Sequence, residues 1–437
     1  MRPAFTDDYQ AEDWFDLAMR FFLCLMALML PYSMAVIEWA FGLSFVTYIA
    51  KRIYVFAKGP RQAWWTMFRP RPNPLNRPIA VYLAVCFVSV FMSDRFADSF
   101  ESLFTKTAEP IILYFLILEA FRSVKQVKVL VAVIFMTAVV TGIDALIQFH
   151  VTGEDFFLGR PLSKGPRATA GFNAPTGLGA YLVMSIPVVA GFWNSRRFAS
   201  AAARTGLLAG LACLFYALVL TFSRGAWLSL ILGSLLTAVA CMIMQRFTRR
   251  QIIAFATGSL LIVGLMGTYY MANKDRYSSL NRSVLNWRVA VWRDTIAMIK
   301  EKPVFGYGIN TYMRQFQHYR YDRLNVPKHK QHRATYAHNC YLQIAMESGL
   351  LGLAAFMWIL TAYYRMALRR IRELMEGRQE RTVLAIGIFT GITAFFIHAF
   401  FDTHFYSLPL AAYLWSMMAA LFIVLNPIAK GRDTSHA

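Results

Sequence analysis

The chain is dominated by long apolar runs that alternate with shorter polar segments. Twelve of these runs approach the roughly 20 residues that an α-helix needs to cross the hydrocarbon layer of a membrane. They lie at about 14–32, 33–50, 79–94, 108–121, 126–149, 177–193, 205–221, 226–244, 252–271, 339–364, 382–400 and 407–425. The pattern predicts an all-α polytopic membrane protein with about 12 transmembrane helices. The run at 108–121 is short, which suggests a tilted or partial span.

The longest polar segment divides the chain into three parts. Residues 1–271 hold the first nine predicted spans. Residues 272–338 form a loop domain on the predicted periplasmic side. Residues 339–437 hold three further spans and a cytoplasmic tail.

The loop domain contains one amphipathic stretch, at 284–301. Four of its apolar residues recur at the spacing of one helix face: Val289, Trp292, Ile296 and Ile299. Tryptophan favours the membrane–water boundary, so we expect an interfacial helix there with Arg288 near its start. The helix should end before Pro303, because the residue preceding a proline is biased away from the α conformation.

Positive charge is unevenly distributed among the loops, and this predicts their orientation. Every second loop is basic, beginning with 51–78, which carries seven Lys or Arg and no acid. Basic loops stay in the cytoplasm, so both termini are predicted to be cytoplasmic and the alternate loops to face outward. The outward segment 272–338 breaks the pattern with thirteen cations and four acids. A loop this long can be translocated despite its charge, but so many outward cations also suggest an anionic partner.

Composition agrees with a membrane protein and excludes other classes. The 437 residues are 57% hydrophobic and 16% charged, whereas a soluble domain carries roughly a quarter charged residues. Basic cytoplasmic loops contribute much of the net charge of +21, so we expect no nucleic-acid partner. The five cysteines contain no CxxC pair, which excludes a zinc ribbon.

Seven of the eight histidines are predicted to lie at or near the outer side: His150, His318, His329, His332, His338, His398 and His404. Imidazole can accept a proton near neutral pH. His338 differs from the others because it opens the tenth span, beside Asn339, where water can reach its ring. For the others, a hydrogen-bonded histidine at the membrane boundary is the simpler interpretation. His329 and His332 lack a nearby cysteine or carboxylate, so no metal site is expected.

Four arginines are predicted at outward helix ends or on the interfacial helix: Arg160, Arg167, Arg224 and Arg288. A guanidinium binds phosphate oxygens through a planar fork. Contact with ordinary lipid headgroups is the simpler alternative. Both interpretations stand for Arg224, whose tight turn between two spans points its charge at the boundary, where a lipid diphosphate would lie.

Some acids inside predicted spans are functional candidates by default; these are Glu38, Glu119 and Asp144. Asp402, in an outer turn, is expected either to pair with an arginine or to orient the histidine. Glu347 follows His338 by nine residues, which is about 900° around a helix and hence the opposite face. We therefore expect Glu347 to be structural. No carboxylate pair suggests a bound divalent metal.

Several short motifs together resemble the O-antigen ligase and polymerase superfamily. They are Glu301-Lys302-Pro303-Val304-Phe305-Gly306-Tyr307-Gly308-Ile309-Asn310, His338-Asn339 with Leu342, Glu347 with Gly349, Gly352 and Leu353, Ser223-Arg224-Gly225, and Arg167 ahead of Gly171-Phe172-Asn173. The resemblance covers roughly residues 160–405. The layout of twelve spans with a medium-sized outer loop is most similar to the O-antigen ligases.

This resemblance implies an enzyme of the bacterial inner membrane whose active site faces the periplasm. It would move a glycan from undecaprenyl diphosphate to lipid A–core, among membrane lipids, without a metal or any other cofactor. The family's essential histidine corresponds to His338, its essential arginines to Arg224 and Arg288, and a further substrate-contacting arginine to Arg167. Because the donor and the acceptor are both anionic, arginines at the outer boundary suit this chemistry.

Three alternatives remain open. An O-antigen polymerase and a protein O-oligosaccharyltransferase share the same chemistry, and the sequence predicts no large added periplasmic domain of the kind that would favour the latter. A lipid-linked-glycan transporter is the alternative from another class. Transporters place charges near the midplane and often show repeated halves, whereas here the arginines cluster at outer helix ends.

Overall fold

The computed structural model describes residues 5–58, 68, 70–163, 165–193, 200–244, 264, 267, 268, 271, 272, 274–322, 336–377 and 381–426. The side chains of residues 5–13, 274–286, 321 and 322 lie outside this description. Within it, regular structure is helical apart from two isolated bridges in the segment before residue 168. The predicted all-α class is therefore confirmed.

The elements follow one another along the chain without large insertions between most helices. They are α1 (Phe5–Met29), α2 (Met34–Lys58), α3 (Asn76–Phe91), α4 (Phe96–Ser102), η2 (Leu103–Ala108), α5 (Glu109–Ala120), α6 (Val124–Ile147), η3 (Gln148–Thr152), α7 (Pro175–Ala190), α8 (Ala201–Leu220), α9 (Arg224–Ile243), α11 (Lys274–Glu301), α12 (Tyr312–Asp322), α13 (Cys340–Glu376), α14 (Thr382–His398) and α15 (Leu408–Leu425).

Eleven of the twelve predicted spans coincide with a helix of the described chain, and the ninth, 252–271, lies almost entirely outside it. Six described helices are long and apolar enough to cross a membrane by length and composition, and three shorter apolar helices accompany them. The protein is thus a polytopic membrane protein, while the number of spans stays a prediction.

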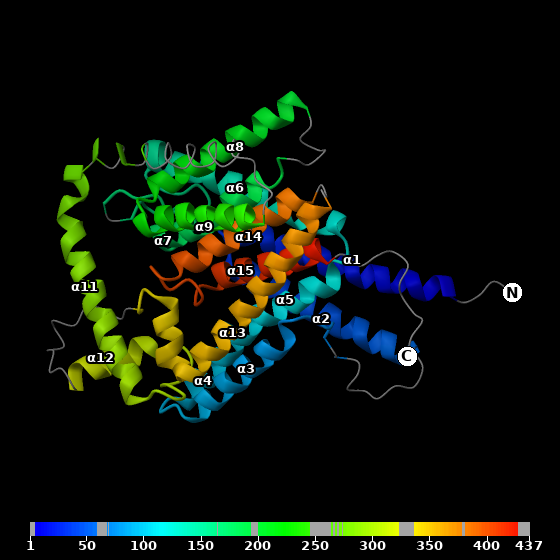
Figure 1. The fold of residues 1–437 in the computed structure, drawn as a ribbon, viewed down its shortest axis with the longest axis horizontal. Coiled ribbons are helices and arrows are strands. Elements are labelled where there is room, and N and C mark those ends of the chain that lie inside the picture. Colours follow the sequence, from blue (N-terminus) through cyan, green and yellow to red (C-terminus); the bar gives the residue numbers. More distant parts are fainter. Residues whose placement is uncertain are drawn as a thin grey trace.

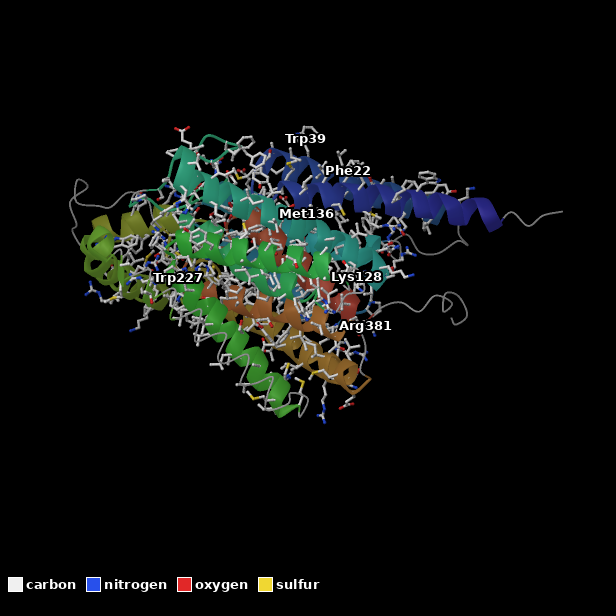
Figure 2. The ribbon with its side chains drawn as sticks, turned by 90° about the horizontal axis from the view of Figure 1, so that it is seen from above. Phe22, Trp39, Lys128, Met136, Trp227 and Arg381 are labelled. Atoms are coloured by element: carbon white, nitrogen blue, oxygen red, sulfur yellow. The ribbon has the colours of Figure 1, made fainter. Side chains whose placement is uncertain are left out.

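The apolar helices pack along one another, with α14 between α7 and α9 and with α13 against α3. Figure 1 shows α11 and α12 lying across one end of this bundle, opposite the end at which α1 begins. The end covered by α11 and α12 is called the first end, and the opposite one the second end. Figure 2 shows Trp227 toward the first end and Lys128 and Arg381 toward the second. The helix ends therefore form two boundaries, and α11 covers the one predicted to be periplasmic.

The interfacial helix differs in part from its prediction. It ends at Glu301 as expected, but it begins at Lys274 rather than near 284, so Arg288 lies in its middle. Ile299 is buried, whereas Val289 and Ile296 are 55% and 44% exposed. The reason is that α11 packs on α13 through a neighbouring face, which leaves some apolar side chains for the membrane boundary. The adjacent α12 was not predicted.

Glu119, a functional candidate by default, is part of a buried ion cluster at the second end of the bundle. Lys51 Nζ lies 2.7 Å from a carboxylate oxygen of Asp16 and 2.7 Å from one of Glu119. Arg52 is 2.9 Å from the other Glu119 oxygen. Removing one member would leave a buried charge unpaired, which costs several kcal/mol. This cluster therefore ties α1, α2 and α5 together.

A break in α13 positions the segment that follows α11. Gly349 adopts φ 72° and ψ 179° inside the helix, and a Cβ there would overlap the Val304 carbonyl oxygen. Leu350 N donates to the Pro303 carbonyl at 2.7 Å. Glu347 is fully buried and accepts hydrogen bonds from Asn310 N at 2.8 Å and from Gln343 at 3.0 Å. These contacts agree with a structural Glu347, which anchors this segment to α13.

Candidate active site

His338 lies two residues before α13, at the first end of the bundle. Asn339 caps the helix, because its side-chain oxygen accepts from Tyr341 N and Leu342 N, each at 3.0 Å. His338 itself has φ 48°, which is uncommon for a residue with a β-carbon and indicates local strain. The helix cap and the bond from Cys340 N to the Ala399 carbonyl, at 2.8 Å, hold this conformation.

Asp402, on the turn after α14, orients the imidazole of His338. Its Oδ1 lies 2.8 Å from His338 Nδ1 and also accepts from Thr403 N at 2.8 Å. Burial raises the pKa of the Asp402 carboxyl, but the His338 bond and the neighbouring imidazoles outweigh it and hold the pKa well below its ordinary value. An ionised carboxylate selects the tautomer with the proton on Nδ1, which places the lone pair on Nε2. Of its two expected partners, Asp402 thus meets the histidine.

A cavity of about 430 Å³ opens beside this pair. The turn between α1 and α2 forms one wall, and the segment before α7 and the turn before α15 form the others. Its polar side chains include Tyr32, Lys106, Arg160, Asn173, Thr176, Tyr336, His338, Asp402 and His404. The cavity is large enough for several sugar-sized groups or a diphosphate, and it gives His338 access to a ligand.

Arg288 and Arg224 lie at the turn that carries Asp402. Arg288 donates from Nη1 to the Phe401 carbonyl at 3.0 Å, and within the described chain its buried Nε has no acceptor. Burial lowers the pKa of Arg288, Asp402 raises it and Arg224 lowers it further. Arg224 is the exposed first residue of α9, and the adjacent Gly225 lies against Phe401. The two arginines therefore lie near the same turn, the one that carries Phe401 and Asp402.

The remaining predicted arginines make backbone contacts. Arg160 lines the cavity and donates from Nη1 to the Gly171 carbonyl at 2.5 Å. Arg167 donates from Nε to the Thr221 carbonyl at 2.8 Å, which joins its loop to the turn before α9. Arg160 is thus placed to meet a ligand. For Arg167 the described contact is structural, and its substrate role stays a prediction.

Lys106 lines the same cavity and is not among the residues predicted from the sequence. It lies in η2, a π-helical turn that precedes α5, and such turns are frequent at functional sites. Its signal in the sequence was weak, because one lysine in a short outward loop resembles any boundary cation. The fold places it on the same cavity as the α1–α2 turn, from a segment more than 70 residues away in the chain.

Other outward histidines have structural contacts. His150 Nε2 lies 2.8 Å from the Tyr216 hydroxyl. The rings of His398 and His404 stack with centroids 4.4 Å apart. Burial lowers the pKa of His404 to about 4. His329 and His332 lie outside the described residues.

The fold and this site define a polytopic membrane protein that places a histidine–carboxylate pair and several cations at one end of its helix bundle. Residues 209–357 match a protein family described as O-antigen ligase, which confirms the superfamily resemblance. The match covers about a third of the chain, and this segment is similar to that family.

A curated relative gives a second comparison. The chain is 27% identical over 199 residues to a ComP-specific O-oligosaccharyltransferase of Acinetobacter baylyi. The match covers 44% of this chain and 33% of the relative, so it spans about a third of that protein's length.

Proposed function

We propose that this protein is an O-antigen ligase, which transfers a glycan from undecaprenyl diphosphate to lipid A–core on the periplasmic side of the inner membrane. One observation carries the proposal. His338 contacts Asp402 at 2.8 Å, and Arg288 binds the carbonyl of the preceding residue, Phe401, at 3.0 Å. A base and a diphosphate-binding cation are thereby held by the same short turn.

In the proposed reaction, His338 Nε2 removes the proton from a sugar hydroxyl of the acceptor. The hydroxyl oxygen attacks the anomeric carbon of the donor glycan from the face opposite the diphosphate. The new C–O bond forms as the bond to the diphosphate oxygen breaks, so the anomeric configuration is inverted. The electron pair leaves with undecaprenyl diphosphate, and Asp402 stabilises the imidazolium that forms.

Arg288 and Arg224 would bind the diphosphate and neutralise the charge that develops on it, a contribution typically worth a few kcal/mol per contact. Arg160, which lines the His338 cavity, would bind a phosphate of the acceptor. The donor and the acceptor are both membrane-anchored anions, so a site with cations at the membrane boundary suits them. No step of this scheme requires a metal ion or a cofactor.

The proposal can be tested by reconstituting the purified protein with an undecaprenyl-diphosphate glycan and two acceptors. Lipid A–core is supplied in one reaction, and a second copy of the donor is supplied in the other, with a metal chelator in both. Glycan on lipid A–core supports the ligase. Chain growth on the donor supports a polymerase instead. No transfer to either acceptor contradicts both, and donor movement across the vesicle membrane would then identify a transporter.

The relative from Acinetobacter baylyi favours one second candidate, a protein O-oligosaccharyltransferase. The chemistry is the same, because the acceptor is again a hydroxyl, here on a Ser or Thr side chain. A third reaction with a serine-containing protein acceptor distinguishes the two. Transfer to protein in preference to lipid A–core would replace the ligase assignment.

A further inference from the structure

A second cavity, of about 800 Å³, opens among α5, α13, α15 and the segment before α3. It is lined by Asn426, which follows α15, whereas Leu408, the first residue of α15, lines the His338 cavity. At a helical rise of about 1.5 Å per residue, these two positions are roughly 27 Å apart. That distance is close to the hydrocarbon thickness of a bilayer, so the two cavities lie at opposite membrane boundaries.

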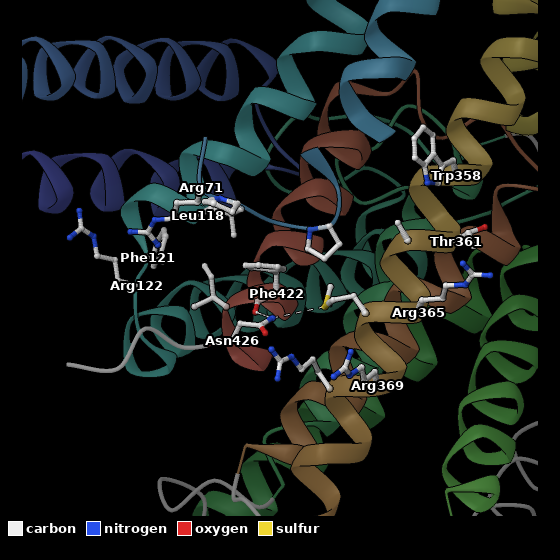
Figure 3. A pocket seen from close by; sticks show the side chains of 16 residues that line it. Arg71, Leu118, Phe121, Arg122, Trp358, Thr361, Arg365, Arg369, Phe422 and Asn426 are labelled. Carbon is white, nitrogen blue, oxygen red and sulfur yellow. Dashed lines mark hydrogen bonds between the residues drawn. The ribbon is translucent and has the colours of Figure 1, made fainter. Parts of the chain in front are cut away.

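The charged side chains that line this second cavity are all cationic. They are Arg71, Arg122, Arg365, Arg369 and Arg370. Figure 3 shows Arg71 and Arg122 on one side of the cavity and Arg365 and Arg369 on the other, with α15 between them. The charge therefore comes from separate segments of the chain that the fold brings together.

The protein neutralises only part of this charge. Arg122 lies 3.2 Å from Asp16, and Arg369 and Arg370 share Glu373 at 3.2 and 2.7 Å. In the part of the chain that the structure describes, neither Arg71 nor Arg365 makes a salt bridge. Burial lowers the pKa of Arg71 below its ordinary value, although the charges of Glu119 and Asp16 oppose part of the shift. A bound anion would compensate for the lost solvent.

The rest of the lining is mainly apolar and includes Leu118, Phe121, Trp358, Met366 and Phe422. The Trp358 side chain is 46% exposed, and tryptophan favours the membrane–water boundary. A ligand in this cavity would meet guanidinium groups at one end and hydrocarbon at the other. A soluble phosphate compound satisfies only the first of these surfaces.

We propose that this cavity binds the headgroup of an anionic phospholipid. The phosphodiester would lie between Arg71 and Arg365, and the acyl chains would leave past Trp358. Basic pockets between transmembrane helices at the cytoplasmic boundary suit such lipids, and the charge of the 51–78 loop predicts that this boundary is the cytoplasmic one. The bound lipid would join α5, α13 and α15.

Thermal unfolding of the full-length protein in nanodiscs tests this site. Phosphatidylglycerol replaces neutral phosphatidylcholine in steps, and a ligand that binds the folded state raises the unfolding temperature. We expect a rise for the wild type, a rise reduced by roughly half or more in Arg71→Gln and in Arg365→Gln, and almost none in the double variant. Arg365 is exposed, so its substitution should leave unfolding in phosphatidylcholine unchanged, which checks the fold.

Arg372→Gln is the matched control, because Arg372 lies on the same helix, pairs with Glu376 at 3.2 Å and does not line the cavity. It should keep the full response to phosphatidylglycerol. If phosphatidylglycerol raises the unfolding temperature of the double variant as much as that of the wild type, the proposed site is wrong. An equal rise from soluble glycerol phosphate in phosphatidylcholine discs would overturn the lipid and indicate a free phosphate compound instead.

Discussion

The side chains of His338 and Asp402 meet at 2.8 Å, Nδ1 to Oδ1, although 64 residues separate them in the chain. The contact joins the start of α13 to the turn after α14. Its geometry matches the arrangement in which a buried carboxylate fixes the tautomer of a catalytic histidine.

Asp402→Asn should lower the transfer rate by about 10²- to 10⁴-fold, because the amide can select the wrong tautomer and cannot stabilise the imidazolium. His338→Ala should lower it at least as much. Steady-state transfer by the purified variants measures both effects. Asp94→Asn is the control, since Asp94 carries the same charge on the same side but lies in an exposed pair with Lys302. Full activity of Asp402→Asn would exclude this carboxylate from catalysis.

Arg288→Lys and Arg224→Lys should each lower activity by about 10- to 100-fold, because an ammonium group keeps the charge but loses the planar fork. The assay varies donor concentration, so that weaker binding is distinguished from a slower reaction. Arg293→Lys, on the exposed side of α11, should behave as the wild type. If both test variants retain full activity, the arginines contact lipid headgroups only.

Lys106→Gln should weaken donor or acceptor use by about tenfold, the effect of losing one charged contact to an anionic ligand. Lys106 lines the His338 cavity from η2. Lys300→Gln removes the same charge from the exposed end of α11 and should have little effect. Equal kinetics for the two variants would show that Lys106 contacts lipid headgroups at the membrane boundary and does not bind the ligand.

Gly349→Ala should destabilise the fold by about 3 kcal/mol or more, because the added carbon meets the Val304 carbonyl at a positive φ. The docking of the segment after α11 would be lost first. Gly206→Ala is the control, since a Cβ there meets nothing within 4 Å. Thermal unfolding compares them, and an unchanged transition for Gly349→Ala would contradict the break in α13.

The pKa of His404 is lowered to about 4, first by burial and further by the charges of His338 and Arg288, while Asp402 opposes the shift. As the pH falls from about 6.5, an ordinary histidine of the unfolded chain binds a proton that the folded chain excludes. Stability should therefore decrease between about pH 6.5 and pH 4. Asp402, whose pKa is depressed, contributes stability that is lost only at still lower pH. Unfolding scans of the wild type and His404→Gln check this, and the variant should show a shallower loss across that window.

Much of the architecture could be predicted because a membrane imposes simple rules. Apolar length predicted helices at eleven of the twelve proposed spans, and Pro303 predicted the end of α11. The predicted start of α11 was wrong, since polar residues can extend an interfacial helix without changing the apolar pattern. The exposed face of α11 was also predicted only in part, because periodicity alone does not distinguish a lipid-facing side from a protein-facing one.

The site shows the same division. A histidine at the mouth of a span and arginines at helix ends were visible in the chain, since position relative to the membrane follows from local hydrophobicity and charge. The sequence did not decide whether an arginine or a histidine is the partner of Asp402. It also did not predict that Lys106 lines the cavity. Nor could the sequence predict that Arg71 and Arg365 lie on two sides of one cavity. Local composition determines how deep a residue sits in the membrane, but which helices become neighbours depends on packing between distant segments.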